Sequence, residues 1–209
     1  MLNIAVLVSG SGSNLQAIID EMKKGEINGK IVTVVSNKPD VYALKRAEEN
    51  NIPSKVIVSK GNENFEKELL SHLKENNVDL IVLAGFLCIL KGDILKEYSN
   101  KIINVHPSLI PSFCGKGYYG LHVHEAALEK GVKVSGATVH VVTPECDAGP
   151  IVLQKAVEVR EDDTPETLQR RIMEEAEWKI LPLAVKLFCD ERVTVTNGKV
   201  YIKSVYQRR

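Results

Sequence analysis

The stretch LNIAVLVSGSGSN, residues 2–14, joins a nearly unbroken apolar run to a loop of glycines and serines. An apolar run of this length is typical of a strand that is buried on both faces of a parallel sheet. Apolar residues then recur at helical spacing, at Leu15, Ile18, Ile19 and Met22. The segment therefore predicts a strand, a tight turn and a helix as the opening unit of an α/β fold.

The same alternation continues through the first half of the chain. Further strands are expected near residues 31–35, 55–58, 79–84 and 102–105, and further helices near 41–49 and 65–73. Strands that alternate with helices predict βαβ crossovers and parallel pairing. The expected fold class is α/β, with a Rossmann-like, open, mostly parallel twisted sheet that carries helices on both faces.

The second half departs from this alternation. A long loop, residues 107–120, precedes a short helix and two long strand candidates, 134–142 and 151–159. Thr164-Pro165-Glu166 is a helix start, and that helix is expected to run to about Phe188. Asn197-Gly198 predicts a hairpin near the end. No repeat or linker divides the sequence, so we expect one domain over residues 1–209.

Composition excludes several classes of protein. The chain has 27 Lys+Arg, 27 Asp+Glu and 44% hydrophobic residues, which excludes a disordered chain and argues against a nucleic-acid-coating protein. No apolar run reaches membrane-spanning length, and the N-terminus lacks the pattern of a signal peptide. The four cysteines are far apart and form neither a zinc motif nor a disulfide framework. We therefore expect a cytoplasmic protein that binds no membrane and no nucleic acid.

The loop Ser9–Asn14 is the first candidate site. Glycines allow a tight turn, and the N-terminus of the following helix offers free N–H groups to an anion, most often a phosphate. A dinucleotide fingerprint would need a glycine at Leu15 and an acidic residue where Ser36-Asn37 stand. The loop thus favours a phosphate monoester over a whole NAD. The alternative is a tight turn that Ser13 or Asn14 caps.

Asn104 and His106 form the second candidate site. They lie two residues apart at the end of a predicted strand, so their side chains point to the same face. The carboxyl ends of parallel strands line the ligand crevice of such sheets. A histidine there can transfer protons, and the amide can donate to an oxyanion. The alternative is a histidine that is hydrogen-bonded to a loop carbonyl.

Three other patterns carry weaker signals. Asp147-Ala148-Gly149-Pro150 is a turn by composition, but a carboxylate beside a catalytic histidine would orient it and favour its charged form. His122 and His124 lack a third metal ligand, so a metal site is not favoured. The acidic run from Glu174 to Glu177 is most simply a solvated helix face.

With these residues in hand, the chain resembles the phosphoribosylglycinamide formyltransferases, the folate-dependent transformylases of purine synthesis. The similarity runs from Asn3 to about Phe188. It rests on IAVLVSGSGSNLQAIID (4–20), VVSNKPD (34–40), DLIVLAGFLCIL (79–90), INVHPSLIPSF (103–113), SGATVHVVTPECDAGPIVLQ (135–154) and the spacing of Glu177 and Pro182. Each match is modest alone, but their order and spacing together are specific.

The resemblance implies a formyltransferase fold and a reaction. The half at about 1–100 would bind glycinamide ribonucleotide, and the half at about 101–209 would complete the cleft for 10-formyltetrahydrofolate. The ribonucleotide amine would attack the formyl carbon directly and form a tetrahedral oxyanion, giving formylglycinamide ribonucleotide and tetrahydrofolate. The resemblance implies these two small-molecule substrates, no metal, and a monomer or homodimer.

The resemblance also implies site residues. Asn104, His106 and Asp147 would be catalytic, with Asp147 supporting the histidine. The ribonucleotide would meet Gly10, Ser11, Gly12, Ser13, Asn14, Pro107, Glu174 and Glu177. The folate would meet Leu87, Cys88, Ile89, Leu90, Asn104, Val142, Thr143, Pro144, Glu145, Cys146 and Asp147.

The chain departs from the family pattern in three places. Cys88 stands where many members have arginine, and Asn62, with Lys60 nearby, stands where another arginine is common. The sequence therefore does not identify the residue that would bind the glutamate tail of the folate. The loop 112–122 varies in length across the family, and the sequence does not predict how this loop closes.

Three alternatives remain beside this interpretation. A methionyl-tRNA formyltransferase would need a further C-terminal domain and a basic surface, and a formyltetrahydrofolate hydrolase would normally carry an extra N-terminal domain. A non-catalytic nucleotide-binding module would need only the phosphate loop. That module would leave Asn104, His106 and Asp147 without a purpose.

Overall fold

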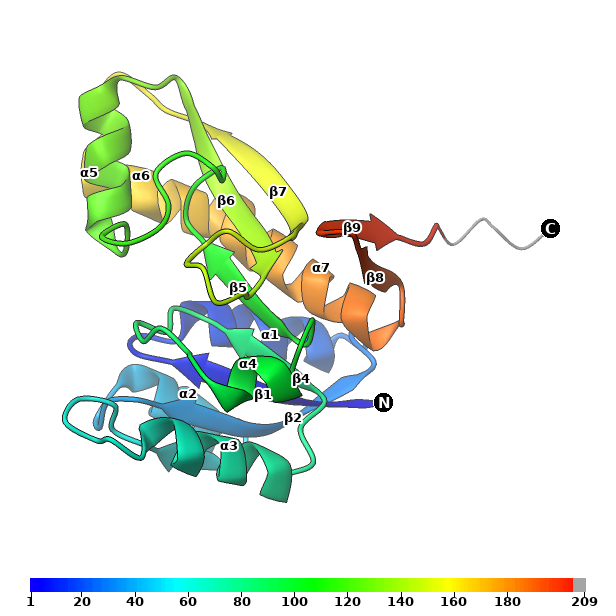
Figure 1. Cartoon of the computed structure of the whole chain (residues 1–209). Helices are drawn as coiled ribbons and strands as arrows, with labels where there is room; N and C mark the ends of the chain where they lie inside the picture. Colours follow the sequence, from blue (N-terminus) through cyan, green and yellow to red (C-terminus); the bar gives the residue numbers. More distant parts are fainter. Residues whose placement is uncertain (205–209) are drawn as a thin grey trace.

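The computed structural model of the chain describes residues 1–204. A seven-stranded sheet and a separate two-stranded hairpin form its β structure (Figure 1). The strands are β1 (Leu2–Val8), β2 (Gly29–Ser36), β3 (Ser54–Val56), β4 (Leu80–Leu83), β5 (Ile102–His106), β6 (Val134–Val141), β7 (Ile151–Glu158), β8 (Val193–Thr196) and β9 (Lys199–Ile202).

The helices connect and cover these strands. They are α1 (Ser13–Lys23), α2 (Tyr42–Glu49), α3 (Phe65–Glu75), α4 (Asp93–Glu97), α5 (Leu121–Lys130), α6 (Pro165–Ile172) and α7 (Trp178–Cys189). A π-helical turn, η1 (Met173–Glu177), lies between α6 and α7. No helix among residues 1–204 combines the length and the apolar character that a membrane crossing needs.

The strand order of the large sheet is β3-β2-β1-β4-β5-β6-β7. Strands β1 to β5 pair in parallel, whereas β6 and β7 pair antiparallel at one side. The chain leaves β1 toward β2 and later returns to the other side of β1 as β4. Such a reversal opens a crevice at the carboxyl ends of the two neighbouring strands.

The core explains why β1 is apolar along its length. Ile4, Val6 and Val8 face a cluster that includes α1, α2, α6 and α7, whereas Ala5 and Leu7 face a second cluster that includes α3 and α4. All five side chains are fully buried. Helices on both faces therefore require apolar residues at both parities of the strand.

The α/β class and the mostly parallel sheet are confirmed, and most elements lie within a few residues of the predicted ranges. Helix α4 was not predicted. The predicted helix from Thr164 to about Phe188 is interrupted by η1. Residues 205–209 of the expected domain lie outside the described part of the chain.

Candidate active site

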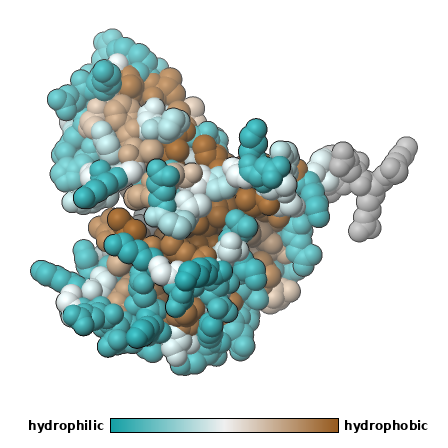
Figure 2. Space-filling model, viewed as in Figure 1, coloured by the Kyte–Doolittle hydropathy of each residue, from teal (hydrophilic) through white to brown (hydrophobic). Residues whose placement is uncertain are grey.

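A cavity of about 700 Å³ lies at the carboxyl ends of β1, β4 and β5. Its volume is that of a pocket for a small organic ligand. The wall includes the loops that follow β1 and β4, the end of β5, the loop before α5 and the segment between β6 and β7. Figure 2 shows apolar surface in the hollow between two parts of the molecule. Leu87 and Ile89 are each 54% exposed in this wall.

The glycine-serine loop at the end of β1 contributes Ser9 to Asn14 to the cavity. Gly12 is the N-cap residue of α1 and has a left-handed backbone with φ 73°. No side chain caps this helix, so the alternative of a turn capped by Ser13 or Asn14 is wrong. The first N–H groups of α1 are therefore left without a side-chain acceptor, which is the arrangement that anion sites use.

Substitution of Gly12 tests how tightly this loop packs against helix α2. A Cβ on Gly12 would lie 2.7 Å from the Cβ of Ala43, and residues other than glycine rarely adopt the left-handed backbone conformation of this position. We expect Gly12→Ala to lower the free energy of unfolding by about 2 kcal/mol, measured by urea titration. Gly10→Ala is the matched control for stability, because a Cβ on Gly10 meets no atom within 4 Å. Equal unfolding midpoints for the two variants would contradict this account of the loop.

Asn104, His106 and Asp147 meet in the same cavity, although they come from separate segments. His106 Nδ1 lies 3.6 Å from Asp147 Oδ2, and His106 Nε2 donates to the Phe113 carbonyl at 2.8 Å. The backbone N–H of Gly115 donates to Asp147 Oδ2 at 2.9 Å. The loop-carbonyl contact that was the alternative for His106 and the carboxylate contact suggested for Asp147 are thus both present.

Burial sets the charge of the histidine. Burial lowers the pKa of His106, and the Phe113 carbonyl and the Asp147 carboxylate offset only part of that effect. In the free protein His106 is therefore mainly neutral at pH 7, and its Nε2–H donates to the Phe113 carbonyl. The expectation that Asp147 favours the charged imidazole agrees with the direction of its effect, but burial outweighs it.

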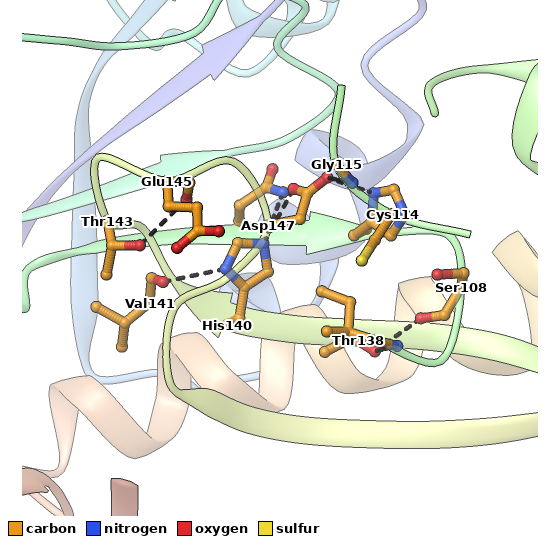
Figure 3. A network of polar contacts seen from close by, with 12 residues as sticks. Ser108, Cys114, Gly115, Thr138, His140, Val141, Thr143, Glu145 and Asp147 are labelled. Carbon is orange, nitrogen blue, oxygen red and sulfur yellow. Dashed lines mark hydrogen bonds and ion pairs between the residues drawn. The ribbon is translucent and has the colours of Figure 1, made fainter. Parts of the chain in front are cut away.

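The carboxylate itself stays ionised. Burial alone would raise the pKa of Asp147, but the neighbouring His140 and His106 rings and the Gly115 N–H hold it at about 2. Figure 3 shows Asp147 close to both His140 and Gly115. A fixed negative charge therefore faces His106 at neutral pH.

His140 is a site residue that the sequence interpretation did not single out. It lies opposite Asn104 in the antiparallel pairing of β5 with β6. Its Nε2 lies 3.1 Å from Asn104 Nδ2 and 3.5 Å from Asp147 Oδ1, and its Nδ1 donates to the Val141 carbonyl at 3.0 Å. With its hydrogen on Nδ1, His140 accepts from the Asn104 amide at Nε2 and so orients that amide.

Glu177 closes the other end of the cavity. Asn14 Nδ2 donates to Glu177 Oε2 at 2.6 Å, and both residues are at least nine-tenths buried. Burial raises the pKa of Glu177, and the Asn14 hydrogen bond offsets part of that rise. The Oδ1 atom of Asn14 is buried without a hydrogen-bond partner. That oxygen is an unused acceptor beside the glycine-serine loop.

Most residues predicted from the resemblance line this one cavity. Those that do are Gly10, Ser11, Gly12, Ser13, Asn14, Leu87, Cys88, Ile89, Leu90, Asn104, His106, Pro107, Val142, Thr143, Glu145, Cys146, Asp147 and Glu177. Two do not. Glu174 is exposed outside the cavity wall, and Pro144 is absent from that wall. The exposure of Glu174 fits the solvated-face alternative, and its contact with the ribonucleotide stays a prediction.

His124 is a second histidine that the sequence interpretation passed over as a site residue. It is fully buried in the first turn of α5, borders the cavity, and has no hydrogen-bond partner on either ring nitrogen. Burial, together with the nearby His106, lowers its pKa to about 4. The ring is therefore neutral at physiological pH. Its companion His122 is exposed and contacts Glu125 at 2.9 Å.

The buried, unpaired ring of His124 should make the stability of the protein depend on pH. The unfolded chain binds this proton more tightly than the folded one, so stability falls as the pH drops from 6.5 toward about 4. We expect His124→Leu to remove at most about 3 kcal/mol of that loss, measured by urea unfolding at pH 7 and pH 4.5. His122→Leu is the matched control. If both variants lose stability with acid as the wild type does, His124 is not buried in its neutral form.

No group of three or more His, Cys, Asp or Glu side chains in residues 1–204 is arranged to hold a metal ion. His122 is exposed and His124 is buried, because residues two apart on a helix point in different directions.

Comparison with known proteins identifies a family whose sequence pattern matches this chain. Residues 2–185 match the model of the family described as formyl transferase. The chain is 40% identical over 205 residues to phosphoribosylglycinamide formyltransferase of Haemophilus influenzae, covering 97% of this chain and 94% of that protein. It is 44% identical over 203 residues to the trifunctional purine biosynthetic protein adenosine-3 of Gallus gallus, covering 95% of this chain and 20% of that protein. The chain thus spans about a fifth of the length of that trifunctional relative.

A solved structure agrees with these sequence relatives. The crystal structure of glycinamide ribonucleotide transformylase 1 from Symbiobacterium toebii superposes with a TM-score of 0.91 at 42% identity. The match covers 98% of this chain and 95% of that one.

Proposed function

Because the chain belongs to the formyl transferase family, we propose that it transfers the formyl group of 10-formyltetrahydrofolate to the amine of glycinamide ribonucleotide. The observation that carries the proposal is that one cavity holds both a loop suited to a phosphate monoester and the Asn104, His106 and Asp147 cluster. A phosphorylated amine would thereby be held beside groups that stabilise an oxyanion and move a proton.

The substrates divide the cavity between them in this proposal. The phosphate lies on the N–H groups of the loop Ser11–Asn14, and the ribose meets Glu177, Asn14 and Pro107. The folate ring enters the apolar side formed by Leu87 to Leu90 and the segment Val142–Asp147. This division supplies apolar surface to the ring system and hydrogen-bond donors to the phosphate.

Asn104 has the donor that the oxyanion needs. Its amide nitrogen carries two hydrogens, of which one is directed at His140 Nε2. The second is free for the formyl oxygen, which becomes anionic when the amine nitrogen forms its bond to the formyl carbon. Because His140 fixes the amide, little reorganisation is required as the charge develops.

His106 moves the proton in this proposal. In the free protein its Nε2 proton is held by the Phe113 carbonyl, so the bound substrate must take over that donor. The amine loses a proton through water to Nδ1 of the imidazole, and Asp147 stabilises the imidazolium that forms. The imidazolium then gives its Nε2 proton to the folate nitrogen as the bond between that nitrogen and the formyl carbon breaks. The imidazole ends neutral, and the amine ends as a formamide.

The rival proposal is a hydrolase on the same scaffold, in which water replaces the amine as the nucleophile. The loop Ser11–Asn14 favours the transferase, because water needs no phosphate-binding loop beside the reacting centre.

A spectrophotometric assay of folate deformylation, with each substrate omitted in turn, tests the proposal. We expect deformylation that requires glycinamide ribonucleotide. Deformylation at the same rate without the ribonucleotide would establish the hydrolase. Absence of deformylation by folded protein would contradict both enzymes and favour a nucleotide-binding module.

A further inference from the structure

Helix α2 lies directly behind the glycine-serine loop and outside the cavity wall. The N–H of Ala43 donates to the Gly10 carbonyl at 3.1 Å, and Arg46 Nε donates to the Ser11 carbonyl at 2.9 Å. Neither Ala43 nor Arg46 lines the cavity. These two contacts therefore act on the loop from the side opposite to any ligand.

The contacts determine where two amide hydrogens point. In a trans peptide the C=O and the N–H of one unit point in opposite directions. The Gly10 carbonyl shares its unit with the Ser11 N–H, and the Ser11 carbonyl shares its unit with the Gly12 N–H. When α2 holds both carbonyls, the N–H groups of Ser11 and Gly12 point away from α2. Within residues 1–204 neither N–H donates to a protein acceptor, and both residues line the cavity.

Arg46 is itself held firmly. Its Nη1 donates to Gln16 Oε1 at 3.1 Å, and its guanidinium lies 4.8 Å from the centre of the Tyr42 ring. Among the described residues no carboxylate lies within ion-pair distance of it. A full positive charge therefore stands behind the Ser11 carbonyl. A cation on a carbonyl polarises the peptide and strengthens the N–H on its far side as a donor.

The cavity needs such a charge if it takes an anion. Its wall carries the carboxyl groups of Glu145, Asp147 and Glu177, and Lys116 is the sole lysine or arginine in that wall. The ionised carboxylate of Asp147 would repel an incoming phosphate. The buried, unpaired Oδ1 of Asn14 independently indicates that a ligand completes this end of the cavity.

We propose that Arg46 is a positioning residue for the phosphate group of the substrate: it fixes the Ser11–Gly12 peptide with its N–H toward the cavity and supplies positive charge from behind. Arg46 makes no contact with the phosphate in this arrangement. The inference rests on the proposed function, because it assumes that the loop receives a phosphate monoester.

The test compares Arg46→Met with Lys45→Met. Lys45 is the adjacent residue of α2, lies 5.7 Å from the Tyr42 ring centre, and pairs with Glu49 at 3.9 Å, away from the loop. Both substitutions remove one positive charge, but only the first releases the Ser11 carbonyl. The probe is ribose 5-phosphate, titrated by calorimetry, with ribose as the uncharged reference. The KM values for both substrates, kcat and the thermal midpoint are measured alongside.

We expect Arg46→Met to weaken ribose 5-phosphate binding by about tenfold or more and to raise the KM for the ribonucleotide similarly. The folate KM and kcat should stay within about twofold, and Lys45→Met should bind the probe as the wild type does. Arg46→Lys, which keeps the charge but loses the fixed planar donors, should restore part of the affinity.

Two results would overturn the inference. Equal probe affinity in Arg46→Met and Lys45→Met would show that Arg46 does not serve the phosphate. A parallel loss of folate and probe affinity, with a lowered thermal midpoint, would show a general structural role instead. If the wild type binds ribose 5-phosphate no better than ribose, the loop is not a phosphate site, and the proposed function fails together with the inference.

Discussion

Replacement of His106 by alanine should lower kcat by roughly 10²- to 10⁴-fold and leave ribonucleotide binding near normal. The reason is the position of the ring. His106 Nε2 carries the proton that the folate nitrogen must receive, and Nδ1 faces Asp147. The phosphate loop lies on a different segment, so affinity for the ribonucleotide should survive. The measurement is kcat from the folate assay together with the dissociation constant of the ribonucleotide from calorimetry.

His122→Ala is the matched control for this variant. His122 is exposed on α5 and contacts Glu125, and it does not line the cavity. We expect its kcat to remain near the wild-type value. Loss of ribonucleotide binding by His106→Ala, with normal turnover of the complex that still forms, would contradict the role in proton transfer.

Asp147→Asn should have the second largest effect. The substitution keeps the shape of the side chain and removes the negative charge, so the imidazolium of His106 loses its nearest counter-charge. Since Asp147 acts to raise the histidine pKa against burial, its loss should lower that pKa further. We expect kcat to fall by roughly 10²-fold or more.

The pKa of His106 in this variant can be measured directly by NMR titration of ring-labelled histidine. The midpoint of His106 should move to lower pH than in the wild type, and the acidic limb of the pH–rate profile should move with it. His122, which lies outside the cavity, serves as the internal control in the same spectra. An unchanged His106 midpoint would show that the two side chains do not interact electrostatically.

The sequence predicted those parts of the molecule whose signal is local. The apolar run of β1, the glycine-serine turn and the helical spacing after it depend on neighbours along the chain, and all three are present. Asn104 and His106 could be predicted to share a face because the strand repeat is two residues. Helix α4 has five residues, which is too short to show a helical period.

The missed parts depend on contacts between distant segments. His140 matters because the register of β5 against β6 sets it opposite Asn104, and that register is not readable from either strand alone. The exposure of Glu174 and the burial of Glu177 depend on the π-helical turn, which changes the helical phase within one turn. The support of the loop by Arg46 likewise joins residues 35 positions apart.

The fate of the formyl carbon tests the central proposal most directly. The protein is incubated with glycinamide ribonucleotide and a 10-formyltetrahydrofolate that carries ¹³C in the formyl group, and the products are separated and analysed by NMR and mass spectrometry. Direct transfer in one cavity predicts that the label appears in the formamide of the ribonucleotide, with none released as formate. Label found as formate, with the ribonucleotide unchanged, would contradict the transferase and establish water as the acceptor.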